Sequence, residues 1–222
     1  MTSVPRDPLT VTVLAYREKP GGKEVAVSVE LAAGDAREHR ILTVRTADFG
    51  RLGIRKGPID QATYDDLEHT AQVLGATHCG ARLLVYSPNT CRSLVLKIMR
   101  HGYTREESVA AVEWLNAQGL IDEHSYLEAE VARCLKKLWG EIRIREKLYT
   151  CGFGADAMAR VPELLAPVDF IANCCRVIDR EFGGLPEDGE ELRRLHRVLR
   201  RYGYSGNEIY IALREMRLEE RS

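Results

Sequence analysis

Residues 99–104 read MRHGYT, residues 149–154 read YTCGFG and residues 200–205 read RRYGYS. Each segment holds a glycine followed by an aromatic residue, and consecutive glycines lie 50 and 51 residues apart. A pattern that recurs at a fixed interval is typical of tandem repeats, and this interval fits three helices per repeat. Repeat arrays present long binding surfaces rather than closed catalytic pockets. The spacing therefore favours a binding protein.

The segments before the three glycines share an apolar register. Eight residues before each glycine stand Leu94, Ile144 and Leu195, and four residues before it stand Ile98, Leu148 and Leu199. Apolar residues at i and i+4 predict a helix face that is turned to a core. The aromatic residues after the glycines are expected to pack inward, with base stacking as the alternative. These residues are Tyr103, Phe153 and Tyr204.

Capping residues mark the helices that follow the glycines. Thr104 with Glu107, and Ser205 with Glu208, have the spacing of a capping box. The second repeat lacks such a box at residues 154–157 and carries Pro162, which a continuous helix does not accommodate. We therefore expect a short or kinked helix there.

The N-terminal region has a different period. Residues 9–13 and 25–31 alternate apolar and polar side chains, which predicts half-buried strands. Residues 40–45 are expected to form a third strand. A Pro-Gly-Gly turn signal within residues 16–23 joins the first two strands as a hairpin. Residues 52–60 are expected to form a bend that leads into the helices.

The predicted fold is mainly α: a tandem array of three three-helix repeats with a small N-terminal antiparallel β element. We expect an N-terminal β-rich extension at residues 1–62. The three helical repeats are expected at residues 63–119, 120–166 and 167–222.

Composition is that of an ordinary folded protein, with 45% hydrophobic and 29% charged residues among 222. We find no apolar stretch of membrane-spanning length and no signal-peptide core in residues 1–7, so a cytoplasmic location is expected. The six cysteines show no CxxC spacing, and His78 and Cys79 with Cys91 would make only a partial metal site. The sequence therefore predicts neither a metal nor a cofactor.

Charge is concentrated although the net charge is only −1. In a helix over residues 190–202, five arginines fall within a sector of about 120°, opposite the apolar face. They are Arg193, Arg194, Arg197, Arg200 and Arg201. Arginine suits bidentate pairing with carboxylate or phosphate, so this face is a candidate binding surface. The alternative is a solvated face balanced by the acidic residues at 187–191.

A weaker basic cluster lies in the second repeat. Its members, Lys136, Lys137, Arg143, Arg145 and Lys147, are interleaved with Glu141 and Glu146. Glu141 and Arg145 stand at i and i+4 and could simply pair with each other. Catalytic motifs such as a Walker-type phosphate loop, HExxH or GxSxG are absent from the sequence. We therefore do not expect an enzyme.

Residues 119–129 read GLIDEHSYLEA, which resembles the "GLIDD-x-x-(Y/F)-A" signature of the bacterial RecX regulatory proteins. Trp139-Gly140 and the helix EIRIREKLYTCG at 141–152 resemble the segments that follow in that family, where the helix reads "RRIRQELRQKG". The similarity extends over residues 70–218 and is weaker at 9–60. The family's "R-x-R-S-x-x-E-L" run is replaced by SPNTCRSL at 87–94.

The resemblance implies a regulator that binds the RecA recombinase filament and modulates it, usually by inhibition of its ATPase and strand-exchange activities. Recombination, DNA repair and the SOS response would be affected. A monomer is expected, with RecA as its partner and single- or double-stranded DNA as a further contact. Two alternatives remain open: a tandem helix-turn-helix-like DNA-binding protein, and a repeat adaptor for another protein.

Overall fold

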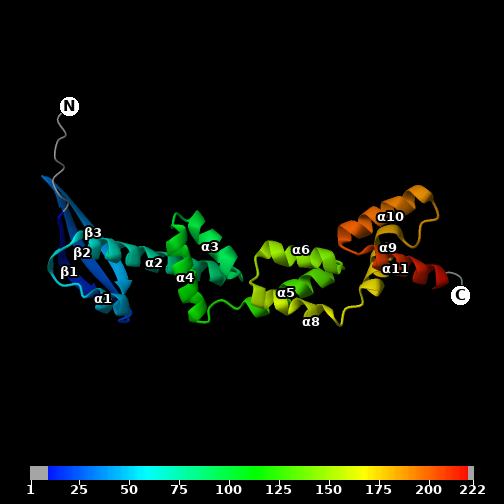
Figure 1. The fold of residues 1–222 in the computed structure, drawn as a ribbon, viewed down its shortest axis with the longest axis horizontal. Coiled ribbons are helices and arrows are strands. Elements are labelled where there is room, and N and C mark those ends of the chain that lie inside the picture. The colour runs from blue at the N-terminus through cyan, green and yellow to red at the C-terminus, as the bar shows by residue number, and fades with distance from the viewer. Residues whose placement is uncertain (1–9, 220–222) are drawn as a thin grey trace, which may run out of the picture. The chain divides into compact units, whose positions relative to one another are not determined.

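The computed structural model describes residues 10–219, which form a mainly helical chain with a small N-terminal antiparallel sheet (Figure 1). Residues 1–9, including the predicted strand start at Leu9, and residues 220–222 lie outside the described part. The chain divides into two compact units. The first joins the described residues up to Tyr86 with Leu94–Leu120, and the second joins Ser87–Ser93 with the described residues from Ile121 onward. The predicted division into four parts is finer and stays a prediction.

The predicted hairpin and third strand are confirmed. They are β1 (Thr10–Glu18), β2 (Glu24–Ala33) and β3 (Ala36–Arg45), and each pairs with its sequence neighbour in antiparallel fashion. Side chains of a strand point alternately to the two faces of its sheet. Val25, Val27 and Val29 therefore share one face, and all three are buried in the core of the first unit.

The prediction of a simple bend over residues 52–60 is wrong. Helix α1 (Thr46–Leu52) comes first and ends at Gly53, which has the left-handed φ of 61°. Strand β4 (Gly57–Ile59) then pairs with β1, so the strand order is β3-β2-β1-β4. A three-residue strand is too short to show a period, and Gly50 weakens the helical signal of α1.

The other helices of the first unit pack around two glycines of a long helix. Gly75 lies beside the Tyr103 hydroxyl, and Gly80 lies beside the side chains of Ile98 and Leu115. A side chain at either glycine would meet these partners, so both glycines allow a close approach. The long helix is α2 (Gln61–Tyr86), and the helices that pack on it are α3 (Cys91–Arg100), which belongs to the first unit from Leu94 onward, and α4 (Arg105–Ala117).

The second unit has two hydrophobic cores. The first core is formed by α5 (Glu123–Lys136), α6 (Glu141–Cys151), α7 (Ala155–Ala159) and α8 (Val161–Leu165). The second is formed by α9 (Phe170–Phe182), α10 (Gly189–Tyr202) and α11 (Gly206–Glu219) (Figure 1). The helix expected to be short or kinked is confirmed as the pair α7 and α8, with Pro162 in the first turn of α8.

The apolar register upstream of the glycines is confirmed. All six predicted core residues are fully buried: Leu94, Ile98, Ile144, Leu148, Leu195 and Leu199. Phe153 and Tyr204 are buried as well, whereas Tyr103 is half-buried. The buried rings of Phe153 and Tyr204 have no free face for a nucleic-acid base, so the expectation of inward packing is confirmed for these two.

Both predicted capping boxes are present. Thr104 exchanges hydrogen bonds with Glu107, and Ser205 does the same with Glu208. In the second repeat the cap comes from another helix. Glu123 of α5 accepts hydrogen bonds from the Gly154 N–H at 3.1 Å and from the Cys91 N–H at 2.7 Å. One carboxylate thus caps the starts of two helices.

The start of α6 meets the end of α10, a contact that we call the α6–α10 junction. The Gly140 N–H donates to the Tyr202 carbonyl at 2.8 Å, and the Ile142 N–H donates to the Gly203 carbonyl at 3.3 Å. The first N–H groups and the last carbonyls of helices have no partners within their own helix. The junction therefore satisfies both sets at once.

A buried tyrosine completes the junction. The Tyr204 hydroxyl donates to the Leu138 carbonyl at 2.7 Å, and burial raises the pKa of Tyr204. A Cβ atom on Gly140 would overlap the backbone of Gly203 and Tyr204, so this position accepts only glycine at the observed backbone separation.

None of the described helices is long and apolar enough to cross a bilayer. Across residues 10–219, no three His, Cys, Asp or Glu side chains are grouped so as to hold a metal ion. His78 pairs instead with Glu24 at 2.8 Å. Cys79, Cys134 and Cys174 are buried free thiols, and desolvation raises the pKa of Cys174 to about 12.

We expect Gly140→Ala to lower the free energy of unfolding by about 1–3 kcal/mol, the usual cost of overpacking. The added methyl group would push the start of α6 away from Gly203. Urea unfolding followed by circular dichroism measures the change. Gly189→Ala is the control, because nothing lies within 4 Å of a Cβ there. The free energy of unfolding of this control should be unchanged or rise by at most about 1 kcal/mol. Equal losses in the two variants would contradict the assignment.

Candidate functional site

The five arginines predicted as a binding face all lie exposed on α10. Within the described residues, none of the five forms an ion pair with a carboxylate. Asp188, one of the acidic residues considered as balancing charge, is occupied as the N-cap of α10. It accepts hydrogen bonds from the N–H groups of Glu190 and Glu191. The cationic face is therefore not neutralised by carboxylates within contact distance.

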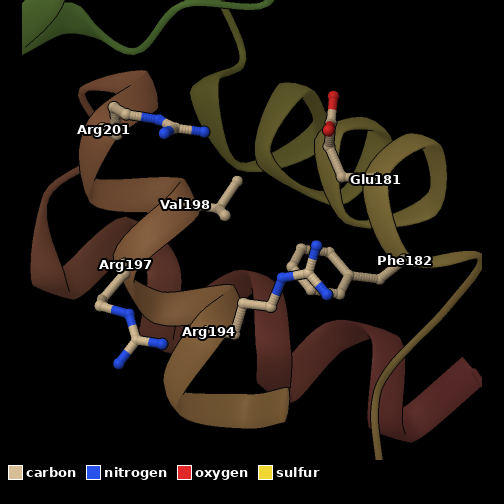
Figure 2. A pocket seen from close by; sticks show the side chains of 6 residues that line it. All are labelled: Glu181, Phe182, Arg194, Arg197, Val198 and Arg201. Atoms are coloured by element: carbon tan, nitrogen blue, oxygen red, sulfur yellow. The ribbon is translucent and has the colours of Figure 1, made fainter.

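Three of these arginines line a hollow of about 460 Å³ between α10 and α9, which we call the helix hollow. It is lined by Arg194, Arg197, Val198 and Arg201 from α10 and by Glu181 and Phe182 from α9 (Figure 2). Figure 2 shows the Arg194 guanidinium against the ring of Phe182, whose centroid lies 5.9 Å away. Arg201 extends toward the space between the two helices. The hollow thus presents three cations and a single carboxylate.

A second hollow of about 520 Å³ lies at the α6–α10 junction, and we call it the junction hollow. It is lined by Lys136, Lys137, Trp139, Arg143, Arg180, Arg201 and Tyr202. Five of these residues are cations, two are aromatic and none is a carboxylate. Because Arg201 lines both hollows, the two adjoin, and together we call them the cationic groove.

Trp139 and a helix end hold the cations of the junction hollow in place. The Arg143 guanidinium lies 4.0 Å from the centroid of Trp139 and donates to the Arg201 carbonyl at 2.9 Å. The Lys137 ammonium lies 5.0 Å from the same ring. Cation–π contacts attract these groups to the ring without neutralising their charge. Arg143 and Lys137 are therefore oriented before any ligand binds.

A hydrogen-bonded chain joins the two hollows. Arg180 donates to the Tyr202 hydroxyl at 2.8 Å, and that hydroxyl donates to Glu181 at 2.9 Å. The hydrogen bond from Tyr202 is the main cause of a lowered pKa of Glu181, and Arg180 contributes further. Arg180 also pairs directly with Glu181 at 3.2 Å, so its charge is partly offset on the side of the helix hollow.

The structure brings together six of the ten residues predicted as a binding surface. Arg194, Arg197, Arg201, Lys136, Lys137 and Arg143 line the cationic groove. Arg193 and Arg200 are exposed on α10 but line neither hollow. Arg145 pairs with Glu141 at 2.7 Å, the alternative considered from the sequence, and Lys147 lies 4.0 Å from Glu130.

The sequence did not identify Arg180, and it did not identify Trp139 or Tyr202 as lining residues. Arg180 stands beside Glu181 and looks like one of many charged surface pairs. No spacing along the chain links Arg180 with Lys136, since different helices bring them together. Of these three residues, only Tyr202 could be placed near the basic face from the sequence, because it ends the arginine-rich helix.

A concave cationic surface of this kind can bind anions through charge-assisted hydrogen bonds, which are the stronger class. Arginine adds a planar fork that matches phosphate and carboxylate oxygens. The residues that line the groove are cations, aromatics, one valine and one carboxylate. Recognition of an anionic partner is the activity that this arrangement supports.

No protein-family model matches the chain. The regulatory protein RecX of Halorhodospira halophila (strain DSM 244 / SL1) is 31% identical over 132 residues, which cover 59% of this chain and 81% of the relative. The chain belongs to the RecX family of regulatory proteins. The resemblance read from residues 119–153 is thereby confirmed.

Other RecX proteins show the same degree of similarity. The RecX protein of Pelodictyon phaeoclathratiforme (strain DSM 5477 / BU-1) is 28% identical over 63% of this chain and 88% of its own length. That of Xanthomonas campestris pv. campestris (strain B100) is 30% identical over 60% and 82%. A crystal structure of a regulatory protein RecX matches with a TM-score of 0.65 and 17% identity. It covers 92% of this chain and 99% of the other. At that identity the match shows a shared fold. These relatives are named as regulatory proteins and not as enzymes.

We expect Tyr202→Phe to raise the pKa of Glu181 toward its ordinary value, because the main hydrogen bond to the carboxylate is removed. An NMR titration of the side-chain carboxyl carbon measures this. Tyr210→Phe on α11 is the control, since Tyr210 is exposed and forms no contact with Glu181. An unchanged pKa of Glu181 in Tyr202→Phe would show that the hydrogen-bonded chain is absent in solution.

Proposed function

We propose that this protein binds the filament of the RecA recombinase and inhibits its ATPase and strand-exchange activities. Such a regulator would act in the cytoplasm as a monomer and would affect recombination, DNA repair and the SOS response. Membership of the RecX family of regulatory proteins supports the regulatory role. The observation that carries the proposal at the level of residues is the cationic groove, which suits an anionic partner surface.

The three-repeat array and the divisions at residues 62, 119 and 166 belong to this proposal. Two equivalent contacts within the second unit support them. The Thr90 hydroxyl donates to the Cys151 carbonyl at 2.9 Å, and the Gly140 N–H donates to the Tyr202 carbonyl at 2.8 Å. The two donors, Thr90 and Gly140, are 50 residues apart, and the two acceptors, Cys151 and Tyr202, are 51 residues apart. The glycines of the three turns have the same spacings. In each case the start of one helix is joined to the end of a later one.

In the proposed complex the groove contacts acidic protein surface and DNA phosphates of the filament. Arg193 and Arg200 extend this face on α10, and Arg145 and Lys147 on α6 are weaker members because carboxylates already pair with them. Complementary charge speeds encounter and sets orientation. Inhibition then requires only that the protein bind one filament state more tightly than another. The protein contributes no chemical step of its own.

We expect the double substitution Arg197→Glu with Arg201→Glu to weaken inhibition of RecA ATPase on single-stranded DNA. The concentration for half-inhibition should rise at least about tenfold, a loss of roughly 1.4 kcal/mol in binding. The matched control is Arg214→Glu with Arg217→Glu, which reverses two exposed arginines on α11 outside both hollows. Circular dichroism is used to check that both variants fold.

Equal loss of inhibition in the two double variants would assign the effect to total charge and not to the groove. Full inhibition by folded Arg197→Glu/Arg201→Glu would remove the groove from the proposed contact. Failure of the unaltered protein to change RecA ATPase at all would overturn the proposed function.

The second candidate function is direct DNA binding by tandem helix-turn-helix-like units. The junction hollow favours it, because five cations without a carboxylate suit phosphodiester groups. The net charge of −1 opposes strong binding without a partner. Binding of the isolated protein to single- and double-stranded DNA across a salt series distinguishes the two functions. Tight binding with a steep salt dependence would favour direct DNA binding.

A further inference from the structure

The junction hollow brings like charges together, and no carboxylate is part of its lining. Lys136, Lys137 and Arg143 come from the end of α5 and the start of α6, whereas Arg180 and Arg201 come from α9 and α10. Like charges that share one site repel each other. The helix hollow differs, since Glu181 is part of its lining. Glu181, outside the lining of the junction hollow, pairs with Arg180 at 3.2 Å. Among the described residues the other four cations have no carboxylate within salt-bridge distance, so a bound anion would relieve the repulsion that remains.

The cations are also arranged to converge. Arg143 is held by Trp139 and the Arg201 carbonyl. Arg180 is held by the Tyr202 hydroxyl and by the Glu181 carboxylate. Side chains whose positions are set before binding lose less conformational entropy when a ligand arrives. Arg143 has used one guanidinium nitrogen on a carbonyl, and the Trp139 contact does not neutralise its charge. Arg143 therefore keeps its charge for an anion, whereas Glu181 offsets part of the charge of Arg180. Both arginines keep further N–H groups that can donate to an anion.

Size and charge indicate the class of anion. A hollow of about 520 Å³ lies within the usual range of small-ligand sites, roughly 300–1,000 Å³. A single carboxylate or monovalent anion would offset only one of five positive charges. A chain of two or three linked phosphates carries several negative charges over a short length, and its oxygens match the arginine fork.

We propose that the junction hollow is a binding site for an oligophosphate anion, which bridges the cations of α5–α6 to those of α9–α10 and stabilises the α6–α10 junction. The oligophosphate is the linked phosphate chain of a free nucleotide, since the phosphodiesters of a nucleic-acid strand carry one charge each and are separated by sugars. Trp139 serves to hold Arg143 and Lys137, so the ring is not assigned to stack on a base. The site needs no RecA and therefore stands or falls separately from the proposed function.

Sodium tripolyphosphate is the probe, titrated into the full-length protein at constant ionic strength in a calorimeter. We expect saturable binding of one anion per chain and a rise in Tm that follows the same saturation, because a ligand of the folded state stabilises it. Sodium sulfate at the same ionic strength should give neither effect. A signal that does not saturate, or an equal rise in Tm with sulfate, would overturn the proposal.

Lys136→Gln with Arg180→Gln should raise the dissociation constant of tripolyphosphate at least about tenfold, since two charge-assisted contacts are lost. The matched control, Arg214→Gln with Arg217→Gln, removes two exposed arginines on α11 and should change it by less than about twofold. Equal weakening in both would overturn the assignment to the hollow. Lys136→Gln alone serves if the double variant unfolds, because Lys136 is exposed. Unchanged affinity in this single variant would count against the site.

Competition then tests whether the site prefers linked phosphates. ATP that displaces tripolyphosphate more strongly than a thymidine oligonucleotide, at equal phosphate concentration, indicates a free nucleotide. The opposite order would overturn the proposal, because a thymidine oligonucleotide carries only separated, singly charged phosphodiesters. Displacement by neither would also overturn the proposal, because ATP carries the linked phosphates that the site is inferred to bind.

Discussion

The contact between the start of α6 and the end of α10 is the constraint on which the candidate site depends. Helix termini leave N–H and carbonyl groups without partners, and here the N–H groups of Gly140 and Ile142 satisfy carbonyls at the end of α10. The opposite partial charges of the two helix ends add to this attraction. Gly140 permits it by lacking a side chain. Without this contact, the cations of α5–α6 would not face those of α9–α10.

The same contact carries an electrostatic cost. It gathers five positive charges in the junction hollow, whose lining contains no carboxylate. The protein offsets part of this cost internally, through the Trp139 ring and the Arg180–Tyr202–Glu181 chain. These contacts orient Arg143 and Arg180 and neutralise only part of the positive charge of the hollow. A fold that retains such a surface is suited to an anionic partner, whether a filament, a nucleic acid or a smaller phosphate ligand.

Local patterns predicted much of the fold. The registers of Leu94, Ile144 and Leu195 identified buried helix faces, and the capping boxes at Thr104 and Ser205 identified where helices begin. Strand β4 was not predicted because three residues are too few to show an alternating pattern. Helix α1 was not predicted because Gly50 weakens its helical signal. Glu123 could not be identified as a cap for two helices, because its partners Cys91 and Gly154 are 32 and 31 residues away.

The sequence by itself determined the mainly helical architecture, the N-terminal hairpin, the resemblance to the RecX proteins and the arginine face of α10. These features depend on spacings within one helix, strand or motif. The tertiary structure alone decided that Arg194, Arg197 and Arg201 share a groove with Lys136, Lys137 and Arg143, that Arg180 joins them, and that Arg145 and Lys147 pair with carboxylates. The physical reason is that charge interactions depend on distance in space, and helix packing sets that distance between residues far apart in the chain.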